Sequence, residues 1–190
     1  FQLDNVTNVD HTYSIVETDT AGNTSTSLAI YGKSAGSTLT GSAGNDAIFA
    51  NGGNDTINGF VGKDTVDGGA GTDTIVLNGT STNLNNATDL QITKVEAVSG
   101  AGSTAGVTID LHNQSEGFTI SGGNFADVIV GGAGGDRIIG GGKGDTLTGG
   151  PGNDTFVYKW ASDSKPAAGN FDTILGFTHG SDKFDFSAIT

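Results

Sequence analysis

Residues Gly131–Ile139 read GGAGGDRII, and residues Gly68–Val76 read GGAGTDTIV. Both follow the nine-residue pattern GGxGxDxUx, where U is apolar, and the pattern recurs in two blocks of the chain. Its aspartates are nine residues apart within each block: Asp46, Asp55, Asp64 and Asp73, then Asp127, Asp136, Asp145 and Asp154. An apolar residue follows two positions after each of them: Ile48, Ile57, Val66, Ile75, Ile129, Ile138, Leu147 and Phe156. A repeat of this period and composition predicts a parallel β-solenoid.

The spacing also predicts which aspartates lie close together. The three residues after each Asp make a short strand, and the glycines before it allow a tight turn with positive φ angles. Because two nine-residue units complete one coil, aspartates 18 residues apart stack on the same side of the solenoid. We therefore expect four stacked pairs: Asp46 with Asp64, Asp55 with Asp73, Asp127 with Asp145, and Asp136 with Asp154. Neighbouring strands lie ~4.8 Å apart, and two bare carboxylates at ~5 Å repel by roughly 3 kcal/mol at an effective dielectric constant near 20.

A cation is needed to hold such stacks together, and the available ligands identify it. Carboxylates and backbone carbonyls are hard oxygen ligands, which suit calcium better than zinc or magnesium. The turn glycines expected to offer carbonyl oxygens are Gly41, Gly44, Gly53, Gly62, Gly68, Gly71, Gly131, Gly134, Gly140, Gly149 and Gly152. Solvated Gly-Asp turns without metal are the alternative, but they would not require Asp at one phase in eight units.

The aspartate phase continues beyond the second block. Asp163 follows Asp145 by 18 residues, and Asp172 follows Asp154 by the same interval. We expect these two aspartates to close the ends of the two stacks, with Ile174 in register with Phe156. The total is then about six calcium ions. Their twelve positive charges would bring the formal net charge of -13 close to neutrality.

Composition supports this dependence on metal and excludes several other functions. The 190 residues include 33 glycines and only 34% hydrophobic residues, and such acidic chains stay unfolded unless their charge is neutralised. There are no cysteines for disulfides or thiolate sites. No apolar run approaches the ~18 residues of a membrane span. The excess of acid over base argues against nucleic-acid binding. The chain begins without Met and is expected to be a fragment of a longer protein.

The pattern divides the chain into five segments. Residues 1–36 are β-rich, and Thr12–Glu17 and Ser25–Tyr31 are expected to form a hairpin around a turn at Asp19–Asn23. Residues 37–76 and 122–157 are the two repeat blocks. Residues 77–121 lack the Gly-Asp turns, but Leu111 and Ile120 lie 18 and 9 residues before Ile129. We expect the solenoid to continue there without metal, with an excursion near Thr80–Asn86; a disordered linker is the alternative. Residues 158–190 are expected to cap the open end.

The last segment resembles a known family. Gly149–Tyr158 (GGPGNDTFVY), Ala161–Ala168 (ASDSKPAA), Phe171–Phe177 (FDTILGF) and Ser181–Ile189 (SDKFDFSAI) are similar to the end of a serralysin-type C-terminal RTX domain. Gly176 and Phe186 depart from the usual Asp and Leu of that family. The resemblance implies a right-handed parallel β-roll that binds calcium, passes through the type I secretion machinery and folds outside the cell or at the bacterial cell surface.

The resemblance does not determine what the whole protein does, because RTX domains accompany many activities. His11, His112 and His179 are far apart and form no HExxH motif, and no GxSxG motif is present, so we expect no catalysis in this chain. Residues 12–23 (TYSIVETDTAGN) resemble the end of an Ig-like repeat of bacterial adhesins. This favours a structural module of an adhesin or surface-layer-type protein. The alternative is an accessory C-terminal domain of a secreted protease, lipase or alginate epimerase.

Overall fold

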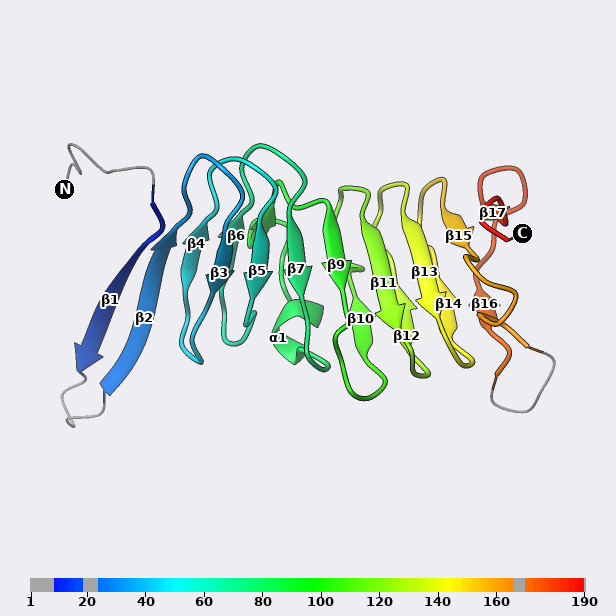
Figure 1. Cartoon of the computed structure of the whole chain (residues 1–190), viewed down its shortest axis with the longest axis horizontal. Helices are drawn as coiled ribbons and strands as arrows, with labels where there is room; N and C mark the ends of the chain where they lie inside the picture. Colours follow the sequence, from blue (N-terminus) through cyan, green and yellow to red (C-terminus); the bar gives the residue numbers. More distant parts are fainter. Residues whose placement is uncertain (1–8, 19–23, 166–169, 190) are drawn as a thin grey trace.

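The computed structural model describes residues 9–18, 24–165 and 170–189, and they form an all-β solenoid of about seven turns (Figure 1). Parallel strands stack along the long axis, so the expected β-roll architecture is confirmed. The one helix among the described residues, α1 (Thr82–Asn85), is a single turn. No helix in the described part of the chain is long and apolar enough to cross a membrane.

The strands of the solenoid form two walls. One wall is an eight-stranded sheet of β3 (Thr38–Thr40), β5 (Thr56–Asn58), β7 (Thr74–Val76), β9 (Ala97–Ser99), β11 (Thr119–Gly123), β13 (Arg137–Gly141), β15 (Thr155–Val157) and β17 (Lys183–Asp185). The other wall has two sheets. The first contains β1 (His11–Thr18), β2 (Thr24–Tyr31), β4 (Ala47–Phe49), β6 (Thr65–Asp67) and β8 (Ile92–Thr93); the second contains β10 (Thr108–Asp110), β12 (Val128–Val130), β14 (Thr146–Thr148) and β16 (Thr173–Leu175).

The apolar residue of each repeat points into the space between the walls. In the repeat blocks it pairs with the apolar residue of the next coil: Ile48 with Val66, Ile57 with Ile75, Ile129 with Leu147, and Ile138 with Phe156. All eight are at most 2% exposed. Successive coils therefore build one continuous apolar core from a single residue per strand, which matches the period seen in the sequence.

The middle segment continues the solenoid, so the expectation that the coils run on through it is confirmed over a disordered linker. Its coils are longer than 18 residues, because Thr74 pairs with Ala97 and Ala97 pairs with Thr119. The expected excursion contains α1, whose Leu84 is buried in the core. Ile120 pairs with Ile138 as predicted. The predicted register of Leu111 was wrong: Ile109 pairs with Ile129, since this coil has two extra residues, and Leu111 is buried beyond the strand.

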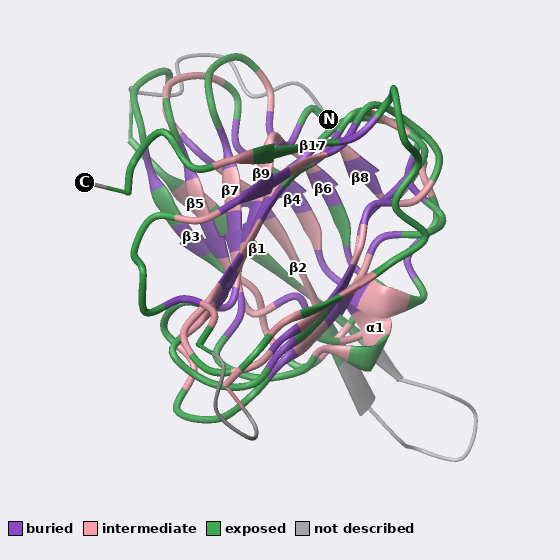
Figure 2. Cartoon of the chain, turned by 90° about the vertical axis from the view of Figure 1, so that its right-hand side faces the viewer, coloured by how far each residue is buried: buried purple, intermediate pink, exposed green. Residues whose placement is uncertain are grey.

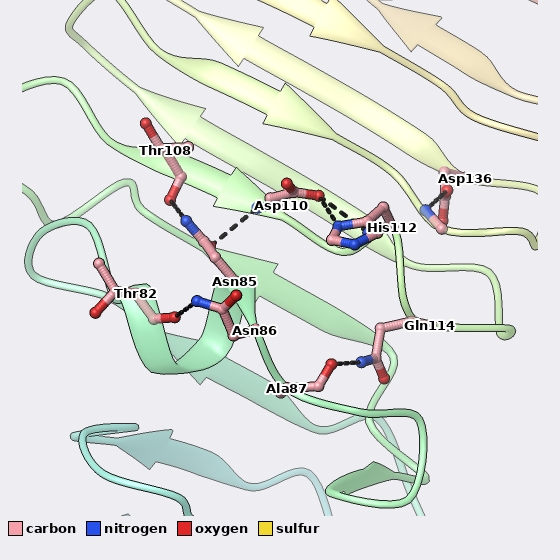
Figure 3. Close-up of polar contacts among 10 residues, drawn as sticks. Thr82, Asn85, Asn86, Ala87, Thr108, Asp110, His112, Gln114 and Asp136 are labelled. Carbon is pink, nitrogen blue, oxygen red and sulfur yellow. Dashed lines mark hydrogen bonds and ion pairs between the residues drawn. The ribbon is translucent and has the colours of Figure 1, made fainter.

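Side-chain amides connect the coils of the middle segment (Figure 3). Asn85 at the end of α1 donates to the carbonyl oxygen of Thr108 at 3.2 Å and accepts from the amide of Asp110 at 3.0 Å. Gln114, which is buried, donates to the carbonyl oxygen of Ala87 at 3.0 Å. These bonds join coils in a region where the Gly-Asp turn is absent.

The N-terminal hairpin is continuous with the solenoid. β1 and β2 pair in antiparallel register from His11 with Tyr31 to Thr18 with Thr24, which confirms the hairpin; its predicted turn lies outside the described residues. β2 also pairs in parallel with β4, aligning Ile30 with Ile48. Strands on both sides of the expected boundary at residue 36 thus share one sheet, and the five-segment division stays a prediction.

At the other end the last coil carries an aromatic cluster. The ring of Phe177 stacks on that of Phe184 with centroids 4.9 Å apart, and Phe184 also contacts Phe156, the last fully buried core residue of its wall. Ile174 pairs with Leu147, and Phe184 pairs with Phe156. The predicted pairing of Ile174 with Phe156 was therefore wrong, because the chain between the last two coils is longer than one repeat. Figure 2 views the solenoid from this end, with β17 in front.

One core position tests the packing directly. Ile138 is fully buried, and its replacement by Ala should destabilise the folded protein by about 2–5 kcal/mol, because a cavity is left between two coils. Urea unfolding followed by circular dichroism measures the change. Val128, which is 41% exposed in β12 of the opposite wall, is the matched control, and Val128→Ala should cost below about 1 kcal/mol. Equal losses for the two variants would contradict the described core.

Candidate metal centre

Each repeat aspartate lies immediately before a strand, at the end of a glycine-rich turn. All eight are buried, with at most 3% of the residue exposed. Buried carboxylates are uncommon unless they are paired or bind a cation. Their position follows from the repeat: the apolar residue two places later points into the core, and the Asp at the end of the turn lies on the same inner face, where its carboxylate reaches the amide of the preceding coil.

The eight aspartates form the predicted pairs. The backbone amide of each upstream Asp donates to the Oδ1 atom of the Asp 18 residues later: Asp46 to Asp64 (2.8 Å), Asp55 to Asp73 (2.8 Å), Asp127 to Asp145 (2.8 Å) and Asp136 to Asp154 (2.9 Å). The first Asp of each stack accepts from a residue of the preceding coil instead, as Asp136 does from the Phe118 amide at 2.7 Å. Each Oδ1 atom therefore fastens one coil to the one before it.

The second carboxylate oxygen is often left without a partner. The Oδ2 atoms of Asp55, Asp73, Asp127, Asp145 and Asp154 are buried and accept no hydrogen bond. An unsatisfied buried acceptor is costly, and a charged one more so. The other three Oδ2 atoms accept a turn amide, as that of Asp136 does from Gly132 at 2.8 Å.

The glycine five residues before the Asp makes room for Oδ2. A Cβ atom built on Gly131 would overlap Oδ2 of Asp136, and one on Gly149 would overlap Oδ2 of Asp154. The same close approach occurs at Gly68, Gly122 and Gly140 toward their own aspartates. At these five positions the absence of a Cβ atom leaves room for the carboxylate to turn inward, whereas Ala50 holds the corresponding position before Asp55. Whether the carbonyl oxygens of these and the other predicted glycines bind metal stays a prediction.

Burial raises the pKa values of six repeat aspartates: Asp64, Asp73, Asp127, Asp136, Asp145 and Asp154. Burial is the largest cause; it raises the pKa values of Asp64, Asp73 and Asp136 to about 6 and that of Asp145 to about 7. Neighbouring carboxylates contribute in the same direction, as Asp172 does for Asp145. None of the four ion pairs among the described residues involves a repeat aspartate. The described side chains therefore supply no positive charge that would offset the repulsion between the buried carboxylates.

The donor set fits a hard cation. Among the described residues no three His, Cys, Asp or Glu side chains gather closely enough to hold a metal ion. Each stack instead places two carboxylates beside peptide groups of the turns, so backbone carbonyls must complete any coordination sphere. Six to eight oxygen ligands in flexible geometry suit calcium. The unpartnered Oδ2 atoms and the space left by the glycines agree with such an ion.

The C-terminal ends of the stacks differ from the prediction. Asp172 accepts from the Asp145 amide at 3.0 Å, and Asp182 accepts from the Asp154 amide at 3.1 Å. Asp172 was expected to follow Asp154 but instead extends the stack of Asp145. The reason is that the coil between Asp145 and Asp172 is 27 residues long. Sequence reasoning missed Asp182, although the apolar Phe184 two positions later carries the signal of the repeat.

Asp163 does not occupy a stack position of its own. It is buried, and its Oδ2 atom accepts from the amides of Lys159 and Trp160 at 2.8 and 3.0 Å. Its charge nevertheless acts on Asp145 and Asp172 and helps to raise the pKa values of both. Asp163 therefore lies close to the end of the Asp145 stack, the stack to which its spacing assigned it.

The raised pKa values predict how the metal-free chain responds to pH. A folded-state pKa of about 7 for Asp145, against an ordinary 3.8, means that the folded state binds protons more tightly than the unfolded state. The resulting destabilisation is greatest above pH 7 and is relieved as the pH falls toward 4. The β-structure signal in calcium-free buffer should therefore increase from pH 8 to pH 5, as measured by circular dichroism. A signal that decreases over this interval would contradict the buried, unpaired state of these carboxyl groups.

Comparison with known proteins agrees with the geometry. A search of curated proteins found no match. The family model described as Peptidase M10 serralysin C terminal matches residues 20–190, which include both repeat blocks, the middle segment and the last coil. Domains of this type are generally calcium-binding β-rolls of secreted proteins, and the domain is structural, not catalytic. The chain therefore belongs to the serralysin C-terminal family, with its aspartate stacks inside the matched region.

Proposed function

We propose that this chain is a calcium-dependent folding module, in which the aspartate stacks are the metal sites. The observation that carries the proposal is the set of buried Oδ2 atoms without a hydrogen-bond partner in five of the eight repeat aspartates. Protein side chains do not satisfy them, and the family's β-rolls generally bind calcium. Bound calcium supplies positive charge between coils and thereby stabilises the folded state.

The proposed ligands come from both blocks and from the last coil. They are Asp46, Asp55, Asp64, Asp73, Asp127, Asp136, Asp145, Asp154, Asp163 and Asp172, with carbonyl oxygens of the turn glycines and Asp182 added at the end of the Asp154 stack. About six ions remain the proposed number. The stacks explain the dependence on metal. Each coil of a block places a buried carboxylate beside that of the coil before it, and without metal these charges are not neutralised.

We further propose that the module folds only after export. Low calcium in the cytosol would leave the stacks unneutralised and the chain extended, which suits passage through the type I secretion machinery implied by the family. Millimolar calcium outside the cell would then favour the solenoid. The proposed location is extracellular, at or near the bacterial cell surface.

Two parent proteins are supported by separate observations. The β1–β2 hairpin, whose sequence resembles the end of an Ig-like repeat, is continuous with the solenoid through the pairing of β2 with β4. This favours a structural module of an adhesin or surface-layer-type protein, and it is our first candidate. The match to a peptidase-associated family favours the second candidate, an accessory domain of a secreted enzyme. The sequence upstream discriminates them: tandem Ig-like repeats support the first, and a catalytic motif supports the second.

Calcium titration tests the folding proposal. The chain should gain β-structure cooperatively at ~0.1–1 mM calcium, the range of extracellular modules, as followed by circular dichroism. Asp136→Asn should raise the midpoint several-fold, because it removes one charge from a stack. Asp110→Asn is the matched control, since Asp110 lies outside the stacks beside His112 and should leave the midpoint unchanged. A chain equally folded in EGTA would overturn the proposal.

A further inference from the structure

The first block does not end at Asp73. The Asp73 amide donates to Oε2 of Glu96 at 2.8 Å, the same link and distance by which the Asp55 amide donates to Oδ1 of Asp73. Glu96 immediately precedes β9, as each repeat Asp precedes its strand. Because β9 is the parallel neighbour of β7, Glu96 occupies the stack position in the next coil.

Glu96 is exceptional within the metal-free middle segment. Two other stack positions of this segment are held by Val107 and Phe118, whose amides donate to Asp127 and Asp136 but whose side chains are apolar. These two residues begin the second pair of stacks without contributing a ligand. Glu96 instead adds a carboxylate at the end of the first block, after a coil 23 residues long.

Oxygen atoms from two coils converge beside this pair. Asp73 is fully buried, and its Oδ2 atom has no hydrogen-bond partner. A Cβ atom added to Gly68 would meet both that Oδ2 atom and the carbonyl oxygen of Lys94 from the next coil. The same arrangement surrounds Gly131, where Oδ2 of Asp136 and the carbonyl oxygen of Gly149 approach each other. The Lys94 ammonium group is directed elsewhere, to Asp67 at 3.0 Å.

We propose that Asp73 and Glu96 hold a further calcium ion between the first block and the middle segment. The inference rests on the proposed function, since it assumes that the stacks bind calcium. The two carboxylates and carbonyl oxygens such as that of Lys94 provide the hard oxygen ligands that this cation requires. Glutamate, with one more methylene group than aspartate, reaches the stack from a coil that lacks the glycine turn.

This site would couple the metal-free coils to the first block. The ion would fasten the turn before β9 to the turn before β7, at the point where 18-residue coils give way to longer ones. The longer coils have a continuous core but no other acidic residue at a stack position among the described residues. When calcium is bound between Asp73 and Glu96, the stability of the middle segment therefore also depends on calcium, as that of residues 37–76 does.

Glu96→Gln tests the proposal, because glutamine keeps an acceptor for the Asp73 amide and removes only the charge. Equilibrium dialysis at 1 mM calcium gives the number of ions bound per chain. The variant should bind one ion fewer than the wild type, and its calcium midpoint for folding should rise several-fold. Glu116→Gln is the matched control: Glu116 is an exposed glutamate of the same segment, and its replacement should change neither quantity.

The outcomes separate the two proposals. A wild-type chain that binds no calcium overturns the proposed function itself. A wild type that binds calcium, together with an unchanged ion number in Glu96→Gln, overturns only the Glu96 site and leaves Glu96 as a hydrogen-bond acceptor. If Glu96→Gln does not fold at any calcium concentration, anomalous scattering from wild-type crystals grown with calcium decides: an ion beside Asp73 and Glu96 supports the site, and the absence of an ion there overturns it.

Discussion

The structure depends on one electrostatic constraint: a parallel solenoid places a buried carboxylate beside the next one in every coil of a repeat block. Neighbouring strands are ~4.8 Å apart, so the carboxylates cannot separate without breaking the ladder. The Oδ1 atoms are satisfied by amides of the preceding coil, whereas most Oδ2 atoms are not satisfied at all. The apolar core of the repeat blocks is thin, since each short strand contributes mainly one buried side chain and the turns add only a few, such as Ala50 and Phe60. Such a core cannot easily offset this repulsion. Counter-charge between coils is therefore a requirement of the fold.

The middle segment shows what a coil needs when that charge is absent. Two of its stack positions are held by Val107 and Phe118, so no carboxylate has to be neutralised at either of them. Amide side chains such as Asn85 and Gln114 join the coils instead, and Leu84 of α1 adds to the core. Hydrogen bonds between neutral groups need no metal to form. The middle segment therefore depends on the two repeat blocks only because its coils pack against theirs. The two repeat blocks, with their stacked carboxylates, are thus joined by a region of different chemistry.

The repeat blocks could be predicted from sequence because one period determines turn, strand, core and stack together. Within each block, aspartates 18 residues apart pair as the spacing predicts. Where glycine turns are missing, coil length is no longer determined by the period, since a loop or helix can be inserted without disturbing the ladder. That is why Ile109 and not Leu111 pairs with Ile129, and why Asp172 extends the Asp145 stack. Glu96 and Asp182 could be recognised as stack members only once strand pairing was known.

The family to which the chain belongs accounts for the fold, and the stacks give the calcium binding that is general in the family a physical cause. The most direct measurement is a crystal structure grown with calcium, with anomalous scattering used to locate the ions. The account predicts ions beside the unpartnered Oδ2 atoms, between Asp55 and Asp73 and between Asp136 and Asp154, each coordinated by both carboxylates and by turn carbonyls. A fully folded solenoid whose stacks contain no ion at saturating calcium would contradict it.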